Sequence, residues 1–145
     1  MPEFLPDLAE AGTQNVCGAA GLVSGLEFLS HVGIDRIFCH ECTLRRVLTD
    51  RLNDIPKIKL FVGPRQSGLV SFISDNLDCE SLSDALGHRG IAVRAGLHCA
   101  PLAHKTAGTL DTGTVRVSFS AFNRTDQVDY TADQIRRIVV KWRVH

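Results

Sequence analysis

Two short β-rich runs constrain the fold of this chain more than any other feature. IKLFVG (residues 58–63) and GLVSFIS (68–74) are separated by the turn-forming stretch GPRQS. A short turn between two such runs favours antiparallel neighbours. GIAVRAG (90–96) and GTVRVSF (113–119) are predicted as a third and a fourth strand. We therefore expect a small, mainly antiparallel sheet.

Helices are predicted before, between and after these strands in the sequence. Apolar residues at helical spacing predict two consecutive helices over residues 16–32 and 34–52. A short helix is predicted over 79–88, capped by Asp78, and a closing helix over 126–141. The order strand, strand, helix, strand, loop, strand, helix predicts an α/β fold of the α+β sandwich type, with helices on one face of the sheet.

The first helix has a composition that differs from the rest. Gly18, Gly21 and Gly25 lower its helix propensity, so we interpret them as sites of close backbone approach to another element. This helix and the extended arm before it do not fit the sandwich. They are expected to form the edge of something larger.

Composition excludes several classes of function. The chain has 145 residues, 44% of them hydrophobic and 22% charged, which is typical of a globular domain with a real core. Its net charge is zero, so we expect neither a nucleic-acid nor a membrane partner. The N-terminus lacks the features of a signal peptide, which favours a cytoplasmic protein. Its five cysteines are then expected to be free thiols.

The CHEC stretch contains a CxxC pair, Cys39 and Cys42. Thioredoxin-like chemistry needs the first cysteine at a helix N-terminus, whereas Cys39 lies more than one turn inside a predicted helix. A zinc site needs about four ligands, and the sequence has no second pair. No metal site is therefore expected, and a zinc or redox protein built on this pair is kept as an alternative.

Cys99 lies in a different setting, in the stretch RAGLHCAP (94–101). It follows a predicted strand, and loops on a rigid sheet often carry reactive groups. Nearby cations favour the nucleophilic thiolate, and four side chains close in sequence can carry positive charge: Arg94, His98, His104 and Lys105. A nucleophile and a partly buried loop cysteine both fit this pattern.

Arg94 and Arg116 each fall in a predicted strand. A planar guanidinium group suits bidentate binding of a carboxylate. A salt bridge on the face of the sheet is the alternative for each arginine.

Two long segments carry a resemblance to a known family. GIAVRAGLHCAPLAHKTAGTLDTGTVRVSFSAFN (90–123) resembles the C-terminal region of cysteine desulfurases, which are class V aminotransferase-fold enzymes that use pyridoxal phosphate (PLP). FLPDLAEAGTQNVCGAAGLVSGLEFL (4–29) resembles the segment after their cofactor lysine. The resemblance implies that residues 1–33 are an arm and helix from the end of the large PLP domain. Residues 34–145 would be the small C-terminal α+β domain that carries the cysteine loop.

The resemblance also implies roles for four residues. Cys99 would attack the sulfur of L-cysteine, or the selenium of selenocysteine, and keep it as a persulfide while alanine leaves. Arg116 would hold the substrate carboxylate, and Arg94 would be a second active-site arginine. Thr13 would reach the PLP phosphate of the neighbouring subunit, which implies a homodimer for the full-length enzyme. A sulfur-acceptor protein would then take the persulfide.

One departure from the family limits what this chain is expected to do. Its lysines are Lys57, Lys59, Lys105 and Lys141, and none lies in the sequence context of the lysine that binds PLP. The isolated chain is therefore predicted to be inactive. A true fragment should expose an apolar patch along residues 16–29. The alternative is a stand-alone sulfur carrier or partner-binding domain that accepts a persulfide on Cys99 without PLP.

Overall fold

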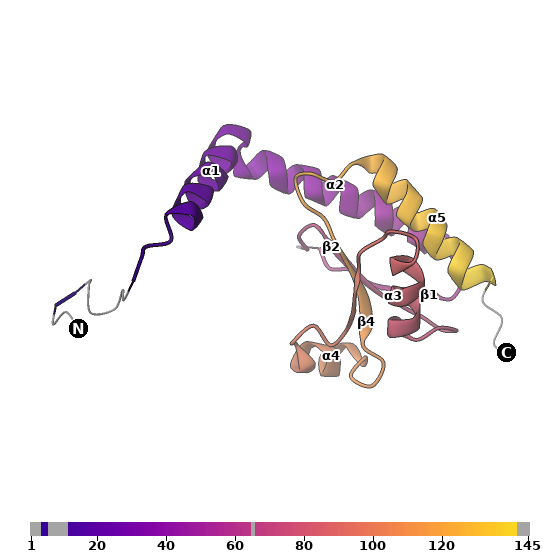
Figure 1. Ribbon diagram of the computed structural model, residues 1–145. Coiled ribbons are helices and arrows are strands. Elements are labelled where there is room, and N and C mark those ends of the chain that lie inside the picture. The colour runs from indigo at the N-terminus through magenta and orange to yellow at the C-terminus, as the bar shows by residue number, and fades with distance from the viewer. Residues whose placement is uncertain (1–3, 6–11, 65, 142–145) are drawn as a thin grey trace. The chain divides into compact units, whose positions relative to one another are not determined.

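The computed structural model describes residues 4–5, 12–64 and 66–141 (Figure 1). Within them it contains five helices and four strands, in agreement with the predicted α+β class. In chain order they are α1 (Val16–Val32), α2 (Ile34–Asn53), β1 (Ile58–Phe61), β2 (Leu69–Ser74), α3 (Cys79–Gly87), β3 (Arg94–Gly96), α4 (Pro101–Ala107), β4 (Thr114–Ser118) and α5 (Thr125–Lys141).

The chain divides into two compact units, Met1–Arg36 and Ile37–His145. In the first unit, α1 begins where the Asn15 side chain accepts a hydrogen bond from the Gly18 amide at 2.9 Å. It ends at Gly33, where φ is +90° and the amide donates to the Leu29 carbonyl. No single helix in the described part of the chain is long and apolar enough to cross a membrane, although α1 and α2 taken together reach that length and hydropathy.

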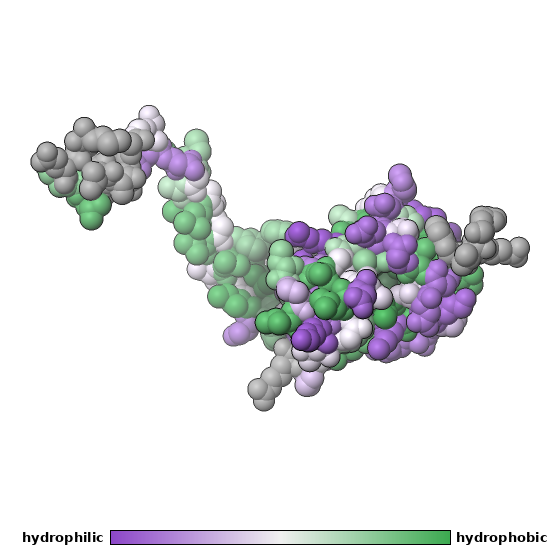
Figure 2. Space-filling model, turned by 90° about the horizontal axis from the view of Figure 1, so that it is seen from below, coloured by the Kyte–Doolittle hydropathy of each residue, from purple (hydrophilic) through white to green (hydrophobic). Residues whose placement is uncertain are grey.

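The apolar side chains of α1 are not covered. Every residue of this helix is described, and none of them is buried. Figure 2 shows hydrophobic groups along the visible side of this segment. This is the exposed apolar patch expected for residues 16–29, and its largest members are Val16, Leu22, Val23, Leu26, Phe28 and Leu29.

The sheet in the second unit is antiparallel throughout, with the strand order β1-β2-β4-β3. Side chains alternate between the two faces of a strand, so the register separates the residues into rows. One row faces the core and consists of Leu60, Phe72, Val115 and Ala95. The next row faces the other way and consists of Phe61, Ser71, Arg116 and Arg94.

Three helices cover the core face of the sheet. The buried hydrophobic residues come from α2 (Leu44, Leu48, Leu52), α3 (Leu82, Leu86), α5 (Val128, Ala132, Ile135, Ile138, Val139), the two central strands (Val70, Phe72, Val115, Val117) and two connecting segments (Ile55, Leu77). In Figure 1, α2 and α5 lie next to each other and α3 lies beside the strands. The prediction of helices on one face of the sheet is confirmed for these three helices. The opposite face carries the row with Arg94 and Arg116.

Two elements differ from the sequence-based predictions. The third strand was predicted over 90–96 but contains only Arg94–Gly96, because the Ile91 amide already donates to the Leu86 carbonyl at the end of α3. The stretch after Cys99 was predicted as a loop but forms α4. Pro101 begins this helix, and Gly108 ends it with φ at +68°, which is a common start and stop pair.

Candidate active site around Cys99

The register of the sheet places two arginines directly opposite each other. Arg94 on β3 pairs with Arg116 on β4, so both side chains leave the same face. Ser71 on β2 flanks Arg116 on its other side. Two like charges in direct cross-strand contact destabilise a sheet unless something neutralises them. The described residues supply no salt-bridge partner for either arginine, so the pair is suited to bind an anion.

The turn that carries Cys99 has an unusual backbone. Gly96 has φ at +101°, followed by His98 at +51° and Cys99 at +59°. A left-handed conformation in two consecutive non-glycine residues is costly, and such strain is concentrated at functional sites. The Ala100 amide donates to the Leu97 carbonyl at 2.9 Å and closes the turn. Cys99 is a free cysteine and is exposed.

His98 anchors this turn to β4. Its Nε2 lies 3.2 Å from the Thr114 carbonyl oxygen and 3.1 Å from Thr114 Oγ1. Burial lowers the pKa of His98, and the positive charge of Arg116 lowers it further. The ring is therefore neutral at pH 7. This corrects the sequence-based expectation that His98 is one of the cations close to Cys99.

Two polar atoms of this site are shielded from solvent without a hydrogen-bond partner among the described residues. They are His98 Nδ1 and Arg116 Nε. The terminal guanidinium nitrogens of Arg116 are not shielded in this way. Both side chains line the same open cavity of about 300 Å³, together with Phe61, Ser71, His104 and Thr114.

The end of the sheet next to α4 holds the buried polar side chains of the described core, His104, Thr109 and Thr114. His104 Nδ1 lies 2.8 Å from Thr109 Oγ1, and its ring centroid lies 5.8 Å from that of His98. Sequence reasoning did not identify this polar layer. A histidine directly before the cysteine, with threonines at both ends of the following loop, is the signal that could have found it.

The other predicted site residues have simpler surroundings. Thr13 is exposed and belongs to the Met1–Arg36 unit, so its role remains a prediction. Cys39 lies inside α2 and is exposed, and Cys42 Sγ is 4.0 Å from the Gln66 carbonyl oxygen. Among the described residues no three His, Cys, Asp or Glu side chains gather as metal ligands. The zinc alternative therefore has no ligand set in this part of the chain.

The described residues do not by themselves fit PLP. All four lysines of the chain are exposed, and none is among the described residues that line the cavity beside Arg116. Among the described residues, Arg116 lines this cavity and no lysine does.

Comparisons with known proteins agree on one family. A family model described as aminotransferase class-V matches residues 3–131. Among the curated relatives, a protein named probable cysteine desulfurase 1 from Mycobacterium leprae is 37% identical over 92% of this chain, which is 22% of the relative. A protein named cysteine desulfurase from Haloferax volcanii is 33% identical over 92% of this chain and 31% of its own length.

Solved structures show the same likeness. The apo cysteine desulfurase of Thermococcus onnurineus has a TM-score of 0.83 at 30% identity, over 94% of this chain and 34% of that one. The cysteine desulfurase CsdA of Escherichia coli, described in an S-sulfonic acid form, has a TM-score of 0.78 at 32% identity, over 88% of this chain and 31% of that one. The chain thus spans between about a fifth and a third of the length of these relatives.

Proposed function

Because the chain belongs to the aminotransferase class-V family, we propose that it is part of a PLP-dependent cysteine desulfurase and carries the residues that receive the sulfur. One observation carries this proposal: Arg94 and Arg116 lie side by side on the face of the sheet, and the strained turn with the exposed Cys99 follows β3. A carboxylate site and a thiol on neighbouring elements suit an amino acid whose side chain bears sulfur.

In this proposal each residue has a distinct task. Arg116 binds the substrate carboxylate through its terminal nitrogens, and Arg94 adds a second positive charge. The Cys99 thiolate attacks the substrate sulfur and forms an S–S bond. The substrate C–S bond breaks, and its electron pair stays on the carbon fragment, which takes up a proton and leaves as alanine. Selenocysteine would react in the same way through its selenium.

The remaining assignments concern the parent enzyme. Its PLP would be held mainly by residues outside this chain, including the lysine. Thr13 would contact the cofactor phosphate across a homodimer. A separate acceptor protein would take the persulfide from Cys99. The exposure of all four lysines supports the view that this chain alone does not catalyse the reaction.

The function is tested by mapping sulfur. The complete enzyme that contains this chain is incubated with PLP and L-cysteine, and its peptides are alkylated and weighed. We expect one additional sulfur atom on Cys99, none in the variant Cys99→Ser, and unchanged labelling in the control Cys79→Ser. Sulfur on another cysteine, or alanine formation that persists in Cys99→Ser, would refute the proposal.

A stand-alone sulfur carrier is the second candidate, and the exposure of Cys99 favours it. The two candidates are separated by mixing the isolated chain with PLP and L-cysteine and trapping imines with borohydride. We expect scattered or absent labelling of the lysines and no alanine. Stoichiometric labelling of one lysine would show that the chain binds PLP by itself. Transfer of a persulfide from a donor protein to Cys99 of a monomeric chain would favour the carrier.

A further inference from the structure

The two unsatisfied polar atoms of the site have complementary chemistry. Arg116 Nε always carries a hydrogen and can only donate. His98 Nδ1 can accept a hydrogen bond whenever the ring hydrogen is on Nε2. Both atoms are shielded from solvent, and both side chains line the same cavity. An unmade hydrogen bond in such a place costs free energy, so a donor and an acceptor of this kind require an explanation.

The surroundings of His98 fix which ring nitrogen carries the hydrogen. The Thr114 carbonyl oxygen lies 3.2 Å from Nε2, and a carbonyl oxygen can only accept. Nε2 therefore donates, and Nδ1 is left with a free electron pair. The lowered pKa of His98 agrees with this neutral form. His98 thus offers an acceptor on the side that is not bound to Thr114.

We propose that His98 is a positioning residue for Arg116: its Nδ1 accepts a hydrogen bond from Arg116 Nε when a carboxylate binds to the terminal guanidinium nitrogens. This inference rests on the proposed function, because it assigns the carboxylate to the amino-acid substrate. The contact orients the planar guanidinium group, and it satisfies both shielded atoms in one step. It also connects the carboxylate site to the Cys99 turn, because His98 directly precedes Cys99.

Two substitutions of His98 separate this role from a purely structural one. His98→Asn places a carbonyl oxygen near the position of Nδ1, where it can accept from Arg116, and asparagine tolerates a positive φ. His98→Gln places its amide near the position of Nε2, where it keeps the contact with Thr114 and loses the contact with Arg116. A positioning role predicts that the Gln variant binds L-alanine more weakly than the Asn variant, whereas a role as anchor of the turn predicts that the Asn variant binds it more weakly. The comparison is made on the dissociation constant and not on stability, because asparagine tolerates the positive φ of this position better than glutamine.

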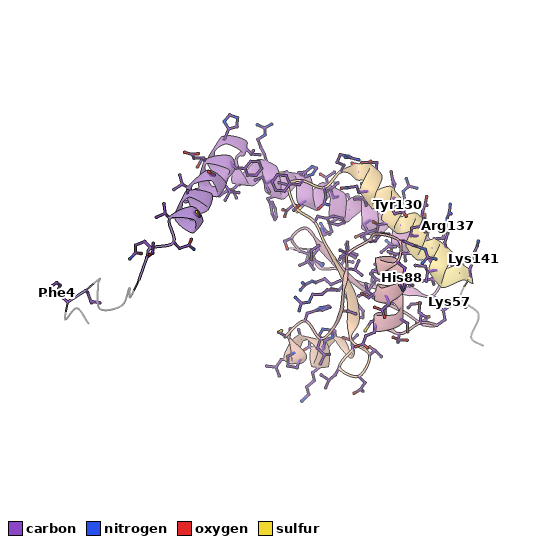
Figure 3. All side chains as sticks on the ribbon, in the orientation of Figure 1. Phe4, Lys57, His88, Tyr130, Arg137 and Lys141 are labelled. Atoms are coloured by element: carbon purple, nitrogen blue, oxygen red, sulfur yellow. The ribbon has the colours of Figure 1, made fainter. Side chains whose placement is uncertain are left out.

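The experiment uses the 145-residue chain with the substitutions Leu22→Glu and Leu26→Glu, which place charges on the exposed apolar face of α1 and are expected to keep the chain monomeric. The chain is labelled with ¹⁵N and titrated with L-alanine, which has the carboxylate but no sulfur to react. In the bound state we expect a ¹⁵N–¹⁵N coupling between Arg116 Nε and His98 Nδ1, and slower solvent exchange of the Arg116 Nε hydrogen. The Nε signal of Arg137, which projects from α5 (Figure 3), is the control and stays unchanged. His98→Gln should weaken binding about tenfold, and His98→Asn by no more than about twofold.

Three results would overturn the inference. They are L-alanine binding at Arg116 without the coupling, the opposite order of the two variants, and no response of either side chain to L-alanine. Inorganic phosphate is titrated in parallel, and an equal response would overturn the assignment to a carboxylate. The persulfide experiment on Cys99 tests the proposed function separately, because the coupling is measured without sulfur transfer.

Discussion

At the scale of single residues, two adjacent residues of the Cys99 turn combine a strained backbone with a specific side-chain environment. His98 has a positive φ and a half-buried ring held by Thr114. Cys99 has a positive φ and an exposed thiol. A backbone of this kind is kept only when the surroundings determine it, and here the anchoring by Thr114 and the closing hydrogen bond of the turn do so. The shifted pKa of His98 and the backbone strain at Cys99 can be measured separately.

The pH dependence of stability reports on His98. Its pKa in the folded chain lies below the value of about 6.5 in an unfolded chain. The unfolded state therefore binds more protons below that pH, and the free energy of unfolding falls as the pH drops from 7.5 to 5. Urea denaturation at several pH values should show a steeper fall for the original chain than for His98→Gln. Identical slopes would contradict the assignment.

The strain at Cys99 is measured by comparing two small residues. Glycine adopts a positive φ without penalty and alanine does not, so Cys99→Gly should be more stable than Cys99→Ala by about 1 kcal/mol. At Arg137, an exposed position on α5, the order should reverse by about the same amount, because glycine is a poor helix former. Chemical denaturation of the four variants gives both differences.

At the scale of elements, the close approach of β3 and β4 depends on a glycine. Gly113 has φ at +62°, and a Cβ added there would lie 2.9 Å from the Gly96 Cα atom and 3.1 Å from Cys79 Sγ. The Cys79 thiol donates to the Thr112 carbonyl at 3.1 Å. Gly113 thus lets the beginning of α3 and the two strands meet just before the strand that carries Arg116.

Replacement of this glycine should damage the sheet. Gly113→Ala combines backbone strain with a contact to backbone atoms that cannot move freely, and we expect a loss of about 2 kcal/mol in the free energy of unfolding. Gly87→Ala is the matched control, because Gly87 lies in α3 with nothing within 4 Å of an added Cβ. Its stability should stay equal or rise slightly. A neutral Gly113→Ala would show that the two strands can separate without cost.

At the scale of the whole molecule, the two units differ in how they use their apolar residues. The Ile37–His145 unit buries them between the sheet and three helices. In α1 the apolar residues stay uncovered, with Leu22 65% and Leu26 55% exposed. A contiguous patch of this kind on a protein in water indicates a surface that another protein surface covers.

Association of the isolated chain follows from this patch. We expect the chain to form oligomers at micromolar concentration, and the double variant Leu22→Glu/Leu26→Glu to be mostly monomeric, because charges on the patch cannot be buried without cost. Sedimentation velocity measures the difference. The double variant Thr131→Glu/Gln134→Glu on α5 is the control and should associate like the original chain.

Local sequence patterns and the tertiary structure account for different features of the fold and of the candidate site. Alternation and helical spacing acted over a few residues, so the sequence alone determined β1, β2, β4 and the long helices, and it singled out Cys99. It missed α4, a short helix with few apolar residues, and it overextended β3, whose first residues bond to the end of α3.

Only the tertiary structure decided the arrangement of the site. The strand order β1-β2-β4-β3 and its register bring Arg94 beside Arg116. A local sequence pattern can predict a strand, but it does not indicate which other strand pairs with it. The same is true of the charge on His98, which depends on burial and on Arg116, a residue 18 positions further along the chain. A sequence specifies the types of side chain, whereas their distances and pKa values are set by which elements pack together.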